Sequence, residues 1–330
     1  MEENVLPENL FEQRLDLTAL SSAVTAIRNE ISKVIVGQHE MVDMLMIGLL
    51  CDGHILIEGV PGVAKTLTAK LMAKIINADF SRIQFTPDLM PSDVLGTSVF
   101  NPKEADFQFK RGPIFSNIIL IDEINRAPAK TQAALFEVME ERQVTIDGTT
   151  HIMEFPFLVL ATQNPIEQEG TYRLPEAQLD RFLFKINVKY PTLEEEVQIL
   201  LTQQSSTQNA LVEDVNKILS TAQIAEYRNV IHQVLVDAKL VEFIAKIVNE
   251  TRNTPSLFLG ASPRASLAVL RASKANAAIK GRDFVTPEDI LEMAAPVMRH
   301  RIILTPEKEM EGITPDELIE NITSNIEVPR

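Results

Sequence analysis

The fold is decided by residues 55–76, which read ILIEGVPGVAKTLTAKLMAKII. Residues 55–58 have the pattern of a short buried strand, and the apolar residues Leu67, Leu71 and Ile75 recur at four-residue steps, as on one face of a helix. A glycine-bearing turn therefore joins a strand to a helix. Such a turn points several backbone N–H groups and the positive end of the helix dipole at one place, which makes it an anion site.

The residues of this turn are those of a phosphate-binding loop. Lys65 adds a mobile cation, and Thr66 supplies a hydroxyl where the Mg²⁺ of a nucleotide needs an oxygen ligand. Ala64 departs from the pattern, which has a second glycine before the lysine, and a left-handed backbone at an alanine costs free energy. An ordinary Gly-Pro turn before an amphipathic helix is the alternative, but the strand and helix context favours nucleotide binding. The expected nucleotide contacts in this loop are Gly59, Gly62, Val63, Ala64, Lys65, Thr66 and Leu67.

Composition limits the classes of function. A chain of 330 residues can bury a large core and predicts one large and one smaller domain. A net charge of −15 argues against general affinity for DNA or anionic membranes. The longest apolar run, residues 44–51, is too short to span a bilayer, and the acidic start at residues 1–4 is unlike a secretory signal, so we expect a cytoplasmic protein. Cys51 has no partner for an intrachain disulfide, and the five histidines lack metal-ligand spacing.

The order of predicted elements indicates an α/β core followed by a helical domain. Strands alternate with helices over residues 18–190, which predicts a parallel sheet between helices. From residue 191 to residue 330 only helical periodicity remains, and the tail is acidic. Residues 1–17 are weakly patterned and predict a loose arm.

Two carboxylates end one of the buried strands. The run Ile118-Ile119-Leu120-Ile121 is followed by Asp122 and Glu123. The carboxyl ends of parallel strands face the ligand in this class of fold, so Asp122 would lie near Mg²⁺ and Glu123 could orient the attacking water. An acidic strand end leading into a helix N-terminus is the alternative. The phosphate-binding loop upstream favours the catalytic interpretation.

Three further polar residues stand out, and two of them, Asn164 and Arg264, are candidates for phosphate contacts. Asn164 follows the strand at 157–162 and could hold the lytic water or the γ-phosphate, although Asn-Pro is also a common turn. Arg264 lies in the first turn of a helix, where the dipole disfavours a cation, so we interpret it as a phosphate sensor rather than a surface charge. Arg181 ends a short helix, and its pattern alone favours a surface cation.

Three segments have less specific patterns. Val36 and Gly37 form an apolar turn that could pack on an adenine base, or could be a plain turn between helices. Residues 86–111 are too irregular for core and predict a surface insertion. Residues 143–157 predict a hairpin about an Asp-Gly pair, and its tip lacks the Lys or Arg needed to grip nucleic-acid phosphates.

The order of these motifs resembles that of the AAA+ ATPases, which implies a P-loop AAA+ core with an all-helical lid. The text between the motifs is similar to the MoxR family over residues 34–303, and within that family Ala64 is an ordinary feature. The strings that carry the resemblance are GVPGVAKT (59–66), QFTPDLMPSDV (84–94), GPIFSNIILIDEINRAP (112–128), ATQNP (161–165), LPEAQLDRF (174–182) and RHR (299–301).

The resemblance assigns roles to the residues that match its motifs. It implies that Lys65 and Thr66 bind the phosphates and Mg²⁺ of ATP, that Asp122 holds Mg²⁺, and that Glu123 is the catalytic carboxylate. It makes Asn164 the residue known in these proteins as sensor 1.

The same resemblance makes Arg264 sensor 2 and Arg181 the arginine finger, which acts on ATP bound to the neighbouring subunit. This replaces the surface-cation interpretation of Arg181. It also implies a homo-oligomeric ring, usually a hexamer.

The resemblance further implies an ATP-driven, chaperone-like remodeller in which hydrolysis moves the lid against the core. Members of the family mature client protein complexes, including metal-cofactor insertion, and often work with a von Willebrand factor A-domain partner. The insertion at 86–111 and the hairpin at 143–157 would face the pore or a client.

Two alternatives belong to other classes of function. A nucleic-acid-remodelling motor would need basic loops, which the acidic composition and the hairpin tip disfavour. A nucleotide-gated binding module with little turnover would not need Glu123.

Overall fold

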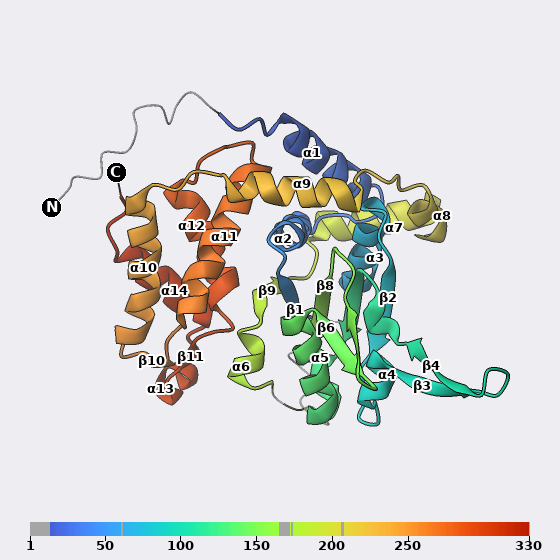
Figure 1. Ribbon diagram of the computed structural model, residues 1–330. Coiled ribbons are helices and arrows are strands. Elements are labelled where there is room, and N and C mark those ends of the chain that lie inside the picture. The colour runs from blue at the N-terminus through green and yellow to red at the C-terminus, as the bar shows by residue number, and fades with distance from the viewer. Residues whose placement is uncertain (1–13, 61, 165–171, 173, 206–207, 330) are drawn as a thin grey trace.

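The centre of the molecule is a five-stranded parallel sheet with the order β2-β5-β8-β1-β9 (Figure 1). The computed structural model describes residues 14–60, 62–164, 172, 174–205 and 208–329. The sheet strands are β1 (His54–Gly59), β2 (Phe80–Gln84), β5 (Ile118–Asp122), β8 (Leu158–Gln163) and β9 (Phe182–Val188). This confirms the predicted parallel sheet between helices.

Helices cover the sheet and then form a separate domain, as predicted (Figure 1). Those that come before the end of the sheet are α1 (Thr18–Ser32), α2 (His39–Leu50), α3 (Lys65–Ile75), α4 (Pro91–Leu95), α5 (Ala129–Glu141) and α6 (Glu176–Leu179). Those that follow it are α7 (Leu193–Ser205), α8 (Gln208–Glu213), α9 (Thr221–His232), α10 (Ala238–Asn253), α11 (Pro263–Ile279), α12 (Pro287–Met298), α13 (Pro306–Met310) and α14 (Pro315–Ser324). A short ribbon of β10 (Leu257–Leu259) and β11 (Ile303–Leu304) joins two segments of the helical domain.

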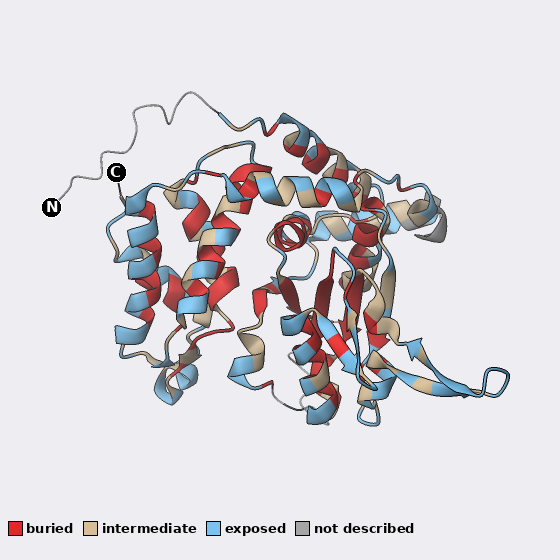
Figure 2. Cartoon of the chain, in the orientation of Figure 1, coloured by how far each residue is buried: buried red, intermediate tan, exposed pale blue. Residues whose placement is uncertain are grey.

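Alternation along the strands builds two apolar layers, because successive side chains of a strand point to opposite faces. Ile118 and Leu120 of β5 join the cluster that contains α1, α2 and α3. Ile119 and Ile121 join the cluster that contains α4 and α5. All four residues are fully buried, which accounts for a strand sequence without polar interruptions (Figure 2).

Parallel pairing gives the sheet two distinct ends. Strand β1 pairs with β9 from His54 opposite Phe182 to Gly59 opposite Val188. Five residue steps along a strand span roughly 17 Å. The phosphate-binding loop leaves the carboxyl end of β1, whereas the residue before β9, Arg181, stands at the amino end.

The helical domain packs on the core through several of its helices. Helix α12 lies on the edge strand β9, and α11 contacts both α1 and α2. Helix α1 also contacts α3, so it bridges the two parts of the molecule (Figure 1). Leu17, just before α1, is buried, whereas residues 1–13 of the predicted arm lie outside the described residues.

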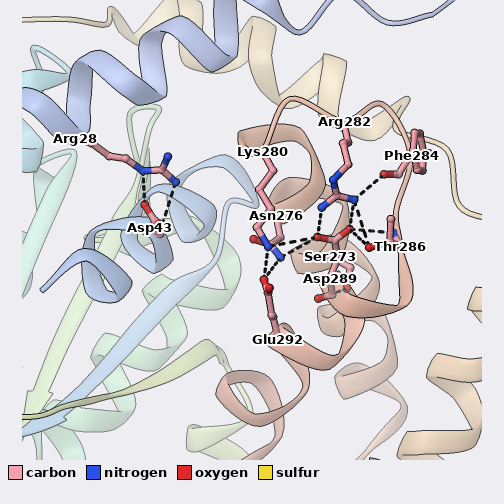
Figure 3. Close-up of polar contacts among 10 residues, drawn as sticks. All are labelled: Arg28, Asp43, Ser273, Asn276, Lys280, Arg282, Phe284, Thr286, Asp289 and Glu292. Atoms are coloured by element: carbon pink, nitrogen blue, oxygen red, sulfur yellow. Dashed lines mark hydrogen bonds and ion pairs between the residues drawn. The ribbon is translucent and has the colours of Figure 1, made fainter. Parts of the chain in front are cut away.

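A buried polar cluster locks the loop between α11 and α12 (Figure 3). The Asp289 side chain is fully buried and accepts two hydrogen bonds of 2.6 Å from Arg282. It also accepts hydrogen bonds from the Thr286 amide and from the Asn276 side chain. Although burial raises the pKa of Asp289, these hydrogen bonds bring it below its ordinary value. The two helices therefore hold a fixed relative orientation.

Two hairpins extend from the core. The predicted insertion contains α4 and the hairpin of β3 (Gly96–Asn101) and β4 (Asp106–Arg111), which projects away from the body of the molecule (Figure 1). The second hairpin pairs β6 (Gln143–Ile146) with β7 (Thr149–Ile152). Asp147 and Gly148 at its tip have φ angles of 49° and 78°, so the predicted Asp-Gly turn is confirmed.

No helix in the described part of the chain is long and apolar enough to cross a membrane.

Candidate active site

A cavity of about 540 Å³ lies at the carboxyl end of the sheet, beside the phosphate-binding loop. It gathers residues from the loop, from the ends of β2, β5 and β8, and from α8. The described lining residues are Gly62, Ala64, Lys65, Thr66, Leu67, Lys70, Arg82, Gln84, Asp122, Glu123, Thr162, Asn164 and Val212. The structure thus brings together the loop, the two carboxylates and Asn164, three groups that are far apart in the sequence.

The loop has the left-handed turns that a phosphate cradle needs. Gly62 has a φ angle of 88°, and Ala64, directly before α3, has a φ of 60°. The Lys65 ammonium donates a hydrogen bond to the Gly59 carbonyl at 2.7 Å. Burial lowers the pKa of Lys65, and the carboxylates Asp122 and Glu123 counteract that shift. The lysine is therefore held inside the cavity by its own loop, next to the place where phosphates would lie.

Asp122 is fixed by two neighbours. Its Oδ1 accepts a hydrogen bond from the Thr162 hydroxyl at 3.1 Å, and its Oδ2 accepts one from Arg82 Nε at 2.6 Å. The same Thr162 hydroxyl accepts a hydrogen bond from the backbone amide of Glu123. One threonine of β8 thus aligns the ends of two adjacent strands.

Glu123 has a left-handed backbone, with a φ of 58°, which turns its side chain off the line of the strand. Its Oε2 accepts a hydrogen bond from Gln84 Nε2 at 2.8 Å and lies 3.1 Å from Arg126 Nε. Two groups therefore hold the carboxylate at the wall of the cavity. Both contacts are made to Oε2.

The oxygen donors in this cavity suit a magnesium ion. The Asp122 carboxylate and the Thr66 hydroxyl line the same space, and hard oxygen ligands are those that Mg²⁺ prefers. When bound with a nucleotide, Mg²⁺ neutralises phosphate charge. Asp122 and Thr66 are the residues that would hold it.

Four other residues predicted to contact the nucleotide are not among the described residues that line this cavity. Gly59 and Val63 belong to the loop but are not among the described residues that line the cavity. Val36 and Gly37, the candidates for adenine contact, are also absent from that set. Gly37 has a φ of 69°, and a Cβ there would lie 2.2 Å from Glu195 Oε1. The close approach of Glu195 is a structural reason for a glycine at this position.

A second cavity, of about 460 Å³, contains the predicted arginine finger, Arg181, and the predicted phosphate sensor, Arg264. Arg181 NH1 lies 3.4 Å from Glu140 Oε2 and donates a hydrogen bond to the Phe136 carbonyl. Arg264 NH2 lies 3.6 Å from the other oxygen of Glu140. Neither arginine lines the first cavity, so the structure groups them with each other and not with Lys65.

The two cavities stand at opposite ends of the sheet. The second is lined by Gly53 and His54 at the amino end of β1, whereas the first surrounds the loop that follows the carboxyl end of β1. The strand between them spans roughly 17 Å. That is farther than an extended arginine side chain reaches, so in this structure Arg181 and Arg264 lie away from the first cavity of their own chain.

Known proteins share this combination of loop, strand ends and helical domain. Residues 54–184 match the family model of the ATPases associated with various cellular activities (AAA), and residues 249–322 match the AAA lid domain. The chain is 44% identical over 310 residues to the chaperone MoxR1 of Mycobacterium tuberculosis, covering 91% of this chain and 81% of that protein. The chain belongs to the MoxR family of AAA+ ATPases. It is also 46% identical to YeaC of Bacillus subtilis, covering 91% of this chain and 92% of that protein.

The MoxR-family fold is also seen in a solved structure. A crystal structure of a protein from Cytophaga hutchinsonii superposes with a TM-score of 0.88 at 44% identity, and the match covers 95% of this chain and 97% of that one. The family assignment predicted from the sequence is therefore confirmed. The protein is a chaperone-like AAA+ ATPase of the MoxR type.

Several lining residues of this MoxR-family site were missed by the sequence analysis. Arg82 and Gln84 end β2, and Gln84 pairs with Asp122 across the sheet. The rule that ligands lie at the carboxyl ends of parallel strands, applied to residues 80–85, would have found both. Lys70, one turn beyond the loop, carries no comparable sequence signal.

Proposed function

We propose that this protein hydrolyses ATP at sites shared between adjacent copies in a closed ring, with a hexamer as the expected size. The energy of hydrolysis would drive chaperone-like remodelling of client protein complexes. This is the activity implied by the family resemblance, and it accounts for the two separate cavities.

The observation that carries the proposal is the position of Arg181. It stands at the amino end of β9, while Lys65 and Asp122 lie at the carboxyl end of the same sheet. An arginine that completes a γ-phosphate site in trans has to be remote from the phosphate site of its own chain. A second copy could bring its arginine cavity to this chain's nucleotide, and a ring would repeat that contact at every interface.

Within each site the roles follow from the positions of the side chains. Lys65 would contact the phosphates, and the γ-phosphate would lie between Lys65 and Asn164. Glu123 would accept the hydrogen bond of the attacking water and orient it, while Gln84 and Arg126 hold its Oε2. Arg181 from the adjacent copy would stabilise the charge that develops on the transferred phosphoryl group.

Arg264 would act from the same side as Arg181. Both side chains contact Glu140, and Arg264 is 61% exposed, so it is accessible to a neighbouring copy. The two arginines would leave Glu140 for the phosphates of the adjacent nucleotide. This makes Arg264 a sensor of the neighbour's nucleotide.

The β3–β4 hairpin is the proposed client contact. Phe100 and Phe107 are 49% and 66% exposed and form an edge-to-face pair with ring centroids 5.3 Å apart. At the base of the hairpin Ser98 hydrogen-bonds Asp147, so the β6–β7 hairpin supports it. Exposed aromatic rings on a supported arm suit contact with apolar segments of a partly unfolded protein. A von Willebrand factor A-domain partner and metal-cofactor insertion into clients are expected from the resemblance.

The proposal is tested with the Glu123→Gln variant of the full chain. The variant should bind ATP with normal affinity and lose turnover, because the amide cannot orient the water as the carboxylate does. Capture from cell extract with this variant and ATP should then retain a client that Glu123→Gln with Lys65→Ala does not retain. Normal turnover in Glu123→Gln would contradict the assigned chemistry, and equal capture by both variants would contradict ATP-dependent remodelling.

A further inference from the structure

A buried arginine of the helical domain grips the turn that carries Arg181. Arg301 follows α12, and its side chain is only 4% exposed. Its Nε donates a hydrogen bond to Asp180 Oδ1 at 2.6 Å, and its NH2 donates to the Asp180 carbonyl at 3.2 Å. The same guanidinium donates to the carbonyls of Phe182 at 2.6 Å and Leu183 at 3.1 Å. One side chain thus binds the backbone on both sides of Arg181.

The second oxygen of Asp180 faces the other arginine helix. Asp180 Oδ2 accepts a hydrogen bond from the Ser262 hydroxyl at 3.2 Å and lies 3.9 Å from Arg264 NH1. Ser262 is the residue that precedes α11, and Arg264 lies in the first turn of that helix. Asp180 therefore joins the turn of Arg181 to α11 through one oxygen and to Arg301 through the other.

Burying an ion pair between two domains costs desolvation free energy. Burial lowers the pKa of Arg301, and the Asp180 carboxylate offsets part of that shift. Apolar residues of similar size could hold two surfaces together at least as well. A guanidinium with several directed hydrogen bonds does something that apolar contacts cannot do, because it fixes the orientation of the backbone it binds.

The neighbours of Arg301 dock the same strand without contacting Asp180. Arg299 NH1 donates to the Lys185 carbonyl, and Arg299 Nε lies 2.9 Å from Asp316 Oδ1. His300 Nε2 hydrogen-bonds the Phe182 carbonyl. Arg299 therefore serves as an internal comparison, since it attaches the helical domain to β9 but has no contact with Asp180.

We propose that Asp180 and Arg301 form a clasp that presents Arg181 and Arg264 as a pair to the nucleotide of the adjacent copy. Both clasp members are positioning residues. The clasp also couples the orientation of the helical domain to the finger, since Arg301 belongs to that domain and Asp180 to the core. This inference rests on the proposed role of Arg181 in trans.

Three variants of the full chain test the clasp. Arg301→Met removes the guanidinium, Asp180→Asn removes the charge of its partner, and Ser262→Ala removes only the hydrogen bond from Ser262 to Asp180. The first two should lower kcat by about ten- to a hundredfold, as expected when a catalytic group is displaced by about 1 Å. The affinity for ATP should not change, because the nucleotide of the same chain lies at the other end of the sheet. Ser262→Ala should lower kcat less, again with ATP affinity unchanged. It provides the test of the clasp if Arg301→Met fails to fold.

Mixed rings separate positioning from a general structural defect. Glu123→Gln subunits lack turnover in their own site but offer an intact clasp and finger to their neighbours. Adding an excess of them to Arg301→Met subunits should raise turnover per Arg301→Met subunit severalfold. A defect confined to the nucleotide site of the Arg301→Met chain would not be rescued in this way.

Two controls distinguish failure of the clasp from failure of the proposed function. Arg181→Ala mixed with Glu123→Gln should show the same rescue, and its absence would refute the trans finger together with the clasp. If that pair is rescued while Arg301→Met and Asp180→Asn are not, or if both clasp variants keep a normal kcat, only the clasp is refuted. Arg299→Met should lower the unfolding temperature with kcat preserved, and an equal loss of kcat in Arg299→Met would show that general docking is responsible.

Discussion

The two cavities at the ends of the central sheet differ in how they are built. At the carboxyl end, the phosphate-binding loop and the ends of neighbouring strands supply a site whose parts already hold one another, as Thr162 holds Asp122. At the amino end, the described lining residues include five arginines and three carboxylates, in a chain with a net charge of −15. One end has a phosphate-binding loop, and the lining of the other has more arginines than carboxylates. The two cavities would complement each other in the proposed ring, where one copy faces another.

The strongest test of this difference is Arg181→Ala. We expect kcat to fall by roughly a thousandfold or more, because a finger supplied in trans contributes about that much. ATP affinity, measured by calorimetry, should be unchanged, since Arg181 is remote from the nucleotide of its own chain. If the isolated Arg181→Ala subunit bound ATP more weakly instead, both cavities would have to serve the same nucleotide.

Lys65→Ala should give the opposite pattern at the other end of the sheet. Removing a charge-assisted contact to phosphate should weaken ATP binding by about ten- to a hundredfold. Subunits with this change should still donate a functional finger, so they should support turnover in Arg181→Ala subunits when the two are mixed. Failure of that support would contradict the independence of the two ends.

Acid should weaken the amino end of the sheet. Burial lowers the pKa of His54 to about 3, and its ring hydrogen-bonds the Val159 amide and the Met139 carbonyl. Burial lowers the pKa of His300 in the same direction. Below about pH 6.5, the ordinary pKa of histidine, these side chains bind protons in the unfolded chain but stay neutral in the folded chain. The free energy of unfolding therefore falls as the pH falls from about 6.5 towards 3. At pH 5 His54 alone should remove about 2 kcal/mol from the free energy of unfolding, and His300 adds to the loss in the same direction.

Urea unfolding at pH 7 and pH 5 measures this loss. His54→Gln should reduce the difference in the free energy of unfolding between pH 7 and pH 5 by the contribution of His54. An unchanged difference in that variant would show that other groups cause the acid sensitivity.

The smallest expected effect concerns the backbone of the phosphate-binding loop. Ala64 has a left-handed φ of 60°, which glycine adopts without strain. Ala64→Gly relieves that strain but raises the conformational entropy of the unfolded chain. These effects oppose each other, so the free energy of unfolding should change by less than about 1 kcal/mol. Ala64→Val should destabilise the protein by more than about 1 kcal/mol, because a branched side chain is strained at this φ. Equal stability of the two variants would contradict the left-handed backbone.

The grouping of residues at the carboxyl end could be predicted from the sequence because its signals are local. The buried strand before Asp122, the loop at Lys65 and the polar residue Asn164 each carry their own pattern, and parallel topology brings them to one edge. The grouping of Arg181 with Arg264 could not be predicted in the same way, because their meeting depends on how the helical domain packs on β9. Arg301 was recognised only as part of a family string, since nothing in its local pattern indicates which carboxylate it pairs with.

Strand β1 begins in the arginine cavity with His54 and ends at Gly59, where the phosphate-binding loop starts. No loop or hinge intervenes, so the strand is a short rigid rod between the arginine cavity and the phosphate-binding loop. In a ring, such rods would lie head to tail around the circumference. A shift of the arginine cavity caused by the adjacent nucleotide would then be carried to the phosphate-binding loop along the covalent main chain of β1, without a flexible intermediary.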